Sequence, residues 1–186
     1  MNSFDFLFKA IVGGFFEYCN DLISSWYYSV PTILISIALG FVVYRATLHF
    51  YENPYVVWAF TGGCVAFIAA VLRPGLVYGG FVRNLQGVDC FSLNGLQIWS
   101  YLLFVFSGEV AGIAIAKWHR QPLTFIAATT GIVLGVLFHY SVAQGWMTTQ
   151  LYPRIALGGI EFLAPAGFAL ALTCVWNCIY KLGVDD

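Results

Sequence analysis

Charged residues are scarce in this sequence: they account for 9% of its 186 residues, whereas 60% are hydrophobic. Soluble domains carry roughly 25% charged residues, so this chain lacks the side chains for a water-facing surface. Its net charge of -1 also leaves no basic patch that could neutralise nucleic-acid phosphates. The composition therefore excludes a nucleic-acid partner and predicts an integral membrane protein whose main surroundings are lipids.

Other absences narrow the function classes. The sequence has no HExxH, no Gly-rich phosphate loop and no CxxC, so the common signatures of zinc, nucleotide and redox enzymes are missing. The cysteines number five, an odd count that argues against a disulfide framework. His49 and His119 fall at expected helix ends, where haem ligation is disfavoured. We therefore expect no cofactor and no metal site, and we do not favour an enzyme.

Long apolar runs dominate what is present, and each is close to the roughly 20 residues that cross a bilayer core as a helix. They predict an all-α polytopic bundle of five transmembrane helices over 31–181, followed by a short tail at 182–186, with six spans as the second choice. The expected spans are 31–50, 55–72, 97–117, 122–143 and 156–180, the last one kinked at Pro165. For residues 73–96 an ordinary loop is favoured over a re-entrant turn at Gly79-Gly80.

The N-terminal segment, 1–30, has a different pattern. On a helical wheel over 4–27, the charged residues Asp5, Glu17 and Asp21 share one half, and large apolar residues share the other. This pattern predicts an amphipathic helix lying in the membrane interface, with packing on the bundle or on a partner as the alternative. A membrane-crossing helix here is disfavoured because each charge near the bilayer centre costs about 2.5–3.5 kcal/mol.

Small residues recur at helical spacing inside the predicted spans. Gly108 and Gly112 are four residues apart, as are Gly131 and Gly135. Small residues let two helix backbones approach closely, so these glycines predict helix-packing faces. Glu109 borders the first face, and we therefore expect its side chain to point into the bundle rather than at lipid.

Depths estimated from the helical rise of about 1.5 Å per residue predict two polar levels. Glu109, Thr129 or Thr130, and Thr173 share one level, while His139 and Glu161 share another and are expected to contact each other. Ionisable groups within spans commonly mark ion or proton routes. The alternative is structural, with a protonated Glu109 bonded to a threonine and a hydrated Glu161.

Two function classes follow. The first is an oligomeric channel or transporter component that moves a cation, protons or a small solute. The second is a non-transporting subunit or anchor of a larger secretion, conjugation or respiratory assembly, or an immunity- or lysis-type membrane factor. Either class predicts a homo-oligomer or a subunit of a larger membrane complex, with the bacterial inner membrane as the expected location. The basic residues divide equally between the two sides, so they do not predict the orientation.

Overall fold

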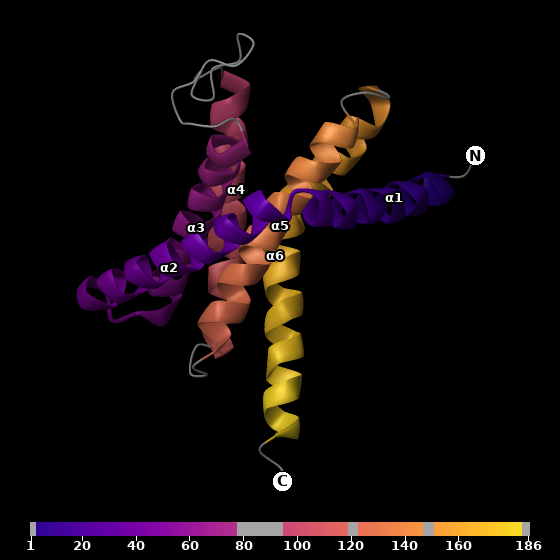
Figure 1. Cartoon of the computed structure of the whole chain (residues 1–186). Coiled ribbons are helices and arrows are strands. Elements are labelled where there is room, and N and C mark those ends of the chain that lie inside the picture. The colour runs from indigo at the N-terminus through magenta and orange to yellow at the C-terminus, as the bar shows by residue number, and fades with distance from the viewer. Residues whose placement is uncertain (1–2, 78–94, 119–122, 147–150, 184–186) are drawn as a thin grey trace.

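The computed structural model describes residues 3–77, 95–118, 123–146 and 151–183, and every regular element in these ranges is helical. The prediction of an all-α chain is confirmed. The elements, shown in Figure 1, are α1 (Ser3–Ser24), α2 (Trp26–Phe50), α3 (Pro54–Val77), α4 (Gly95–Ile115), the 3-10 turn η1 (Ala116–Trp118), α5 (Thr124–Trp146) and α6 (Leu151–Leu182).

Three stretches in the described part of the chain are long and apolar enough to cross a membrane: Trp26–Phe50, Pro54–Leu72 and Leu163–Leu182. Shorter apolar stretches occupy Tyr101–Ile115 in α4 and Thr124–His139 in α5. The chain thus has the helices of an integral membrane protein, as the composition predicted. A total of five spans stays a proposal.

Several helix boundaries differ from the predicted spans. Because proline favours the first turn of a helix, the first span was expected to begin at Pro31, but α2 begins at Trp26 and contains Pro31. Arg73-Pro74 was expected to end the second span, yet α3 continues through both residues to Val77. Proline removes one helical hydrogen bond without always ending a helix, which explains both differences. α6 likewise exceeds its predicted span at both ends and contains Pro165.

The turn between α2 and α3 follows the expected capping chemistry. The backbone N–H of Tyr55 donates to the side-chain oxygen of Asn53 at 2.9 Å, and the N–H of Val57 donates to the Asn53 carbonyl at 3.1 Å. Asn53 therefore caps α3, and Pro54 occupies the first helical position, where its missing N–H carries little cost.

α3 and α4 are joined by direct backbone contact. A Cβ atom added to Gly62 or Gly108 would collide with the backbone carbonyl of the other glycine, and one added to Gly112 would collide with the carbonyl of Trp58. These contacts define an antiparallel register in which 62 faces 108 and 58 faces 112. Only glycine permits this approach, which maximises dispersion contact where lipid supplies no hydrophobic force between helices.

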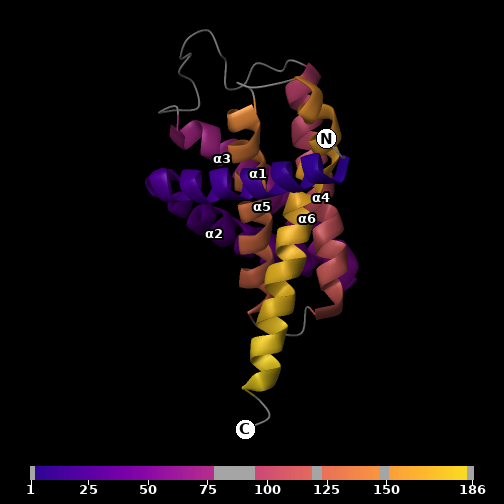
Figure 2. The ribbon, with the colours of Figure 1, turned by 90° about the vertical axis from the view of Figure 1, so that its right-hand side faces the viewer.

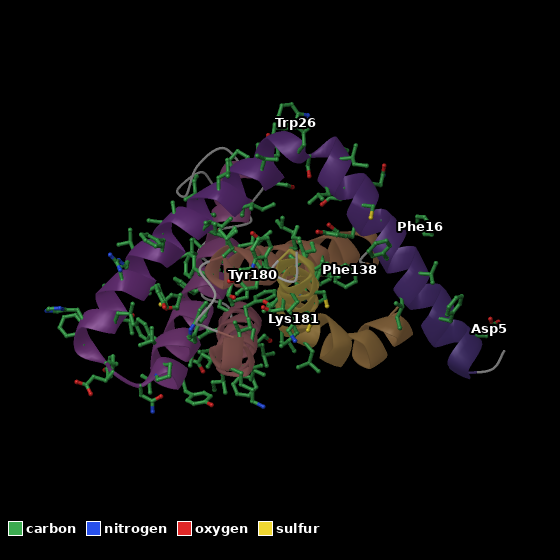
Figure 3. The ribbon with its side chains drawn as sticks, turned by 90° about the horizontal axis from the view of Figure 1, so that it is seen from below. Asp5, Phe16, Trp26, Phe138, Tyr180 and Lys181 are labelled. Carbon is green, nitrogen blue, oxygen red and sulfur yellow. The ribbon has the colours of Figure 1, made fainter. Side chains whose placement is uncertain are left out.

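α5 and α6 repeat the arrangement. A Cβ atom on Gly131 would meet the backbone of Ala169, and one on Gly135 would meet the backbone of Pro165. α6 also contacts α4. It changes direction near its middle (Figures 1 and 3). Its C-terminal end extends beyond α4 and α5 (Figure 2). α5 is the central helix, because it contacts each of α1, α2, α3, α4 and α6.

α2 has its small and hydroxyl-bearing residues inside and its large apolar residues outside. Its buried face consists of Ser29, Thr32, Ser36, Gly40 and Thr47, and this face packs against α3 and α5. Such an inside-out distribution is expected where lipid is the solvent, since large apolar side chains can face acyl chains and small polar ones can fill helix contacts.

α1 and α2 meet near Trp26 and diverge around the other helices (Figure 3). α1 packs on the bundle through Tyr18, whose ring lies 5.6 Å from that of Phe138 and 5.8 Å from that of Phe168, both edge-on. Phe15 and Phe16 of α1 stay exposed. Packing on the bundle, the alternative considered from the sequence, is thus observed, and an interfacial position for the exposed face stays a prediction.

The α5–α6 contact predicts that a larger side chain at Gly135 destabilises the protein. Gly135→Val should destabilise the protein by at least about 1–3 kcal/mol, the usual cost of overpacking, because the added carbons would meet the backbone of α6 at Pro165. The measurement is the thermal unfolding midpoint of the detergent-purified protein. Gly167→Ala is the matched control in the same helix pair, since a Cβ at Gly167 meets nothing within 4 Å. Equal midpoints for both variants would contradict the close contact.

Candidate functional site

Glu109 lies beside the α3–α4 contact rather than at the centre of the bundle. It follows Gly108, whose backbone touches that of Gly62, and one helical step of about 100° turns it to the edge of that face. A Cβ atom added to Gly63 would lie 3.0 Å from Cγ of Glu109 and 3.5 Å from its Oε1. Glycine at position 63 therefore leaves the space that the carboxylate occupies.

The half-buried Glu109 side chain forms part of an open groove of about 260 Å³ between α2, α3 and α4. Apolar side chains make up most of its lining, which includes Val43, Phe60, Phe67 and Val105 together with the thiol of Cys64. Within the described part of the chain, Glu109 has no hydrogen-bond or ion-pair partner. A carboxylate in such surroundings either holds a proton or requires a cation or donor from another molecule.

The predicted polar layer around Glu109 stays a prediction. Glu109 forms no hydrogen bond with Thr130 or Thr173. Thr129 faces α2 near Gly40, and its hydroxyl donates to the Phe125 carbonyl of its own helix at 2.8 Å. Thr173 is fully buried, and its hydroxyl has no partner in the described structure.

His139 is half-buried on α5 and faces α4. Its ring lies edge-on to that of Phe104, with centroids 4.8 Å apart and planes at 85°. The side chain of Glu161 lies outside the described residues, so the His139–Glu161 pairing stays untested. His49 is exposed at the end of α2 beside Phe50, and His119 also lies outside the described residues. Among the side chains that are described, no three His, Cys, Asp or Glu residues gather as metal ligands would.

The structure also contains a polar contact that sequence reasoning missed. The Ser141 hydroxyl on α5 donates to Oδ2 of Asp21 on α1 at 2.7 Å, and Ser141 is buried. The helical pattern places Asp21 on the polar half of α1, but no local pattern identifies a partner 120 residues away. This bond and the Tyr18 aromatic contacts fix the C-terminal half of α1 against the bundle.

The chain was compared with known proteins. No family model, curated protein or solved structure matches it. The assignment of function therefore rests on the geometry of the chain itself.

The α1–α5 contact can be tested with Ser141→Ala. Removing a hydrogen bond to a carboxylate costs about 1.5–3 kcal/mol, so α1 should detach more readily and its amides should exchange hydrogen faster than in the wild type. Hydrogen exchange resolved by mass spectrometry is the measurement. Ser24→Ala is the control, because Ser24 is exposed and its hydroxyl bonds only to the nearby Asp21 carbonyl. Unchanged exchange in α1 of Ser141→Ala would rule out a docking role for the bond.

Proposed function

We propose that the chain crosses the membrane five times and acts as a component of an oligomeric channel or transporter, with Glu109 lining a path for a cation or protons between subunits. The observation that carries the proposal is the half-buried carboxylate in an open apolar groove. An intramembrane carboxylate is costly unless it pairs with another group or serves a permeating ion. The described part of the chain supplies no partner for the Glu109 carboxylate. We therefore propose that a neighbouring subunit covers the open side of the groove and completes the surroundings of this carboxylate.

A path between subunits is favoured over a path through one copy. The two tightest helix contacts leave no room between backbones at Gly62–Gly108 and Gly131–Ala169. Several buried hydroxyls, such as those of Thr32 and Thr47, are bonded within their own helices. An ion crossing a single copy along these contacts would have neither space nor a continuous series of free oxygen ligands.

The lengths of the helices support five spans. α4 has 21 residues and α5 has 23, which at about 1.5 Å per residue exceeds 30 Å, the thickness of a typical hydrocarbon core. Together with the three stretches in α2, α3 and α6 that meet the length and hydropathy of a membrane helix, they support the proposal of five crossings. A bacterial inner membrane is the location that we assign to this architecture.

The second candidate is a non-transporting subunit or anchor of a larger assembly, or an immunity- or lysis-type membrane factor. The observation that favours it is the exposed apolar surface of two helices. Only 17% of the residues in the most apolar stretch of α2 are buried inside the described structure. The corresponding share for the most apolar stretch of Leu163–Leu182 is 22%. Helices covered so little by their own chain are suited to binding the transmembrane helices of a different protein.

Glu109→Gln distinguishes the two candidates. If a cation or proton passes the carboxylate, the variant should reduce flux in proteoliposomes to near the level of empty vesicles, while its unfolding midpoint stays close to the wild-type value. Proton and potassium fluxes are followed with vesicle-trapped dyes, and Glu52→Gln in the exposed α2–α3 turn is the control.

Unaltered flux in Glu109→Gln would remove this residue from the mechanism. A wild-type protein without flux, which native mass measurement finds bound to foreign subunits, would favour the anchor instead. A homo-oligomer with flux that depends on Glu109 supports the first candidate.

A further inference from the structure

Unpartnered polar atoms gather at one end of the α5–α6 pair. They belong to one residue at the start of α5 and three near the end of α6, and each of these atoms is shielded from solvent without a hydrogen-bond partner in the described structure. The atoms are Oγ1 of Thr124, Oγ1 of Thr173, Nε1 of Trp176, and Oδ1 and Nδ2 of Asn177. Buried polar groups are almost always hydrogen-bonded, so this concentration requires an explanation.

The helix register brings these residues to the same level. Gly131 touches Ala169 and Gly135 touches Pro165, so each step toward the start of α5 is matched by a step toward the end of α6. Thr124 is seven residues before Gly131, which is about two turns. It therefore lies on the α6-facing side of α5, level with Trp176. Thr173 follows Ala169 by about one turn, so this residue lies on nearly the same face of α6.

Three other threonine hydroxyls, two in α2 and one in α5, bond within their own helix, whereas the buried hydroxyls of Ser36 and Thr61 also have no partner in the described structure. Thr32, Thr47 and Thr129 each donate to the carbonyl four residues earlier, at distances of 2.7, 2.7 and 2.8 Å. Thr173 has the equivalent carbonyl of Ala169 within its own helix but does not use it. A threonine side chain in a helix adopts one of two rotamers, partly because of this bond, and in Thr173 the bond is not made.

The cluster lies near one end of the helix bundle. α6 contacts both α4 and α5, and its C-terminal end continues beyond theirs (Figure 2). Asn177 stands at the level where α5 begins, and Lys181, about one turn farther on, is exposed. The four residues thus lie just inside the end of the bundle where α6 emerges.

We propose that Thr124, Thr173, Trp176 and Asn177 form an internal binding site for a small uncharged molecule that both donates and accepts hydrogen bonds. Two hydroxyls and one carboxamide offer donors and acceptors, and the indole N–H adds a donor. None of the four side chains is ionisable, so a charged ligand would stay uncompensated in a site of low polarity. Water and small solutes bearing hydroxyl groups share the required chemistry. The site is separate from the Glu109 groove, which is lined by α2, α3 and α4.

The test uses the sign of a stability change in the full-length protein, and needs no transport activity. Thr173→Val and Thr124→Val keep the side-chain shape and remove the hydroxyl. If a bound molecule pairs with the hydroxyls, each variant should lower the unfolding midpoint by about 2–4 °C, the shift that one hydrogen bond produces in a chain of this size. Thr129→Val is the matched control, because its hydroxyl bonds only within α5, and it should unfold near the wild-type temperature.

Midpoints at or above the wild-type value in both variants would overturn the proposal, since valine would then only remove an unsatisfied hydroxyl. A second pair of variants, Thr173→Ser and Thr173→Ala, tests the proposal if the valine variants fold poorly. Both lose the methyl group, so a higher midpoint for serine supports the site and equal midpoints refute it.

Glycerol titration identifies the source of the ligand. A difference between wild type and Thr173→Val that widens with glycerol supports a hydroxyl-bearing solute, because a ligand stabilises only the protein that binds it. A constant difference supports bound water.

Discussion

The direct contact of helix backbones is the constraint on which the rest of the structure depends. At Gly62, Gly108, Gly112, Gly131 and Gly135 even one additional carbon would enter the facing helix. Lipid chains are as apolar as leucine, so helices in a membrane gain little by hiding apolar side chains from their surroundings. Close packing of small residues replaces that force with dispersion contacts and fixes two antiparallel pairs, α3–α4 and α5–α6. α2 and α1 then pack around these pairs, chiefly through α5 and α3.

Backbone contact also determines where polar groups can lie. No side chain fits within the tight contacts, so functional groups are displaced to their edges and ends. Glu109 follows the contacting Gly108 by one residue and lies in an outer groove. Thr173 and Trp176 follow the contacting Ala169 and lie where the α5–α6 pair ends. The two candidate sites are therefore products of the same packing rule, one at the side of a helix pair and the other at its end.

Some of this arrangement was readable from the sequence. The four-residue spacing of glycines predicts packing faces because close approach needs small residues on one side of a helix. Which helix fills each face depends on tertiary packing, and nothing in the pattern assigns Gly62 to Gly108. The direction of the Glu109 side chain depends on tertiary packing for the same reason, since α3 decides on which side of the contact the carboxylate falls. Asp21 and Ser141 meet only because α1 folds back across α5.

The exposed surface of the chain poses two different physical problems. Large apolar side chains on α2 and the C-terminal half of α6 are uncovered, and in water such surface would cause aggregation. Acyl chains cover it at no cost, so exposure of these residues alone does not require a partner protein. Lipid cannot do the same for a carboxylate, which needs a proton, a cation or a hydrogen-bond donor. The groove that holds Glu109, although much smaller than the apolar surface, therefore carries the stronger argument for assembly with another subunit.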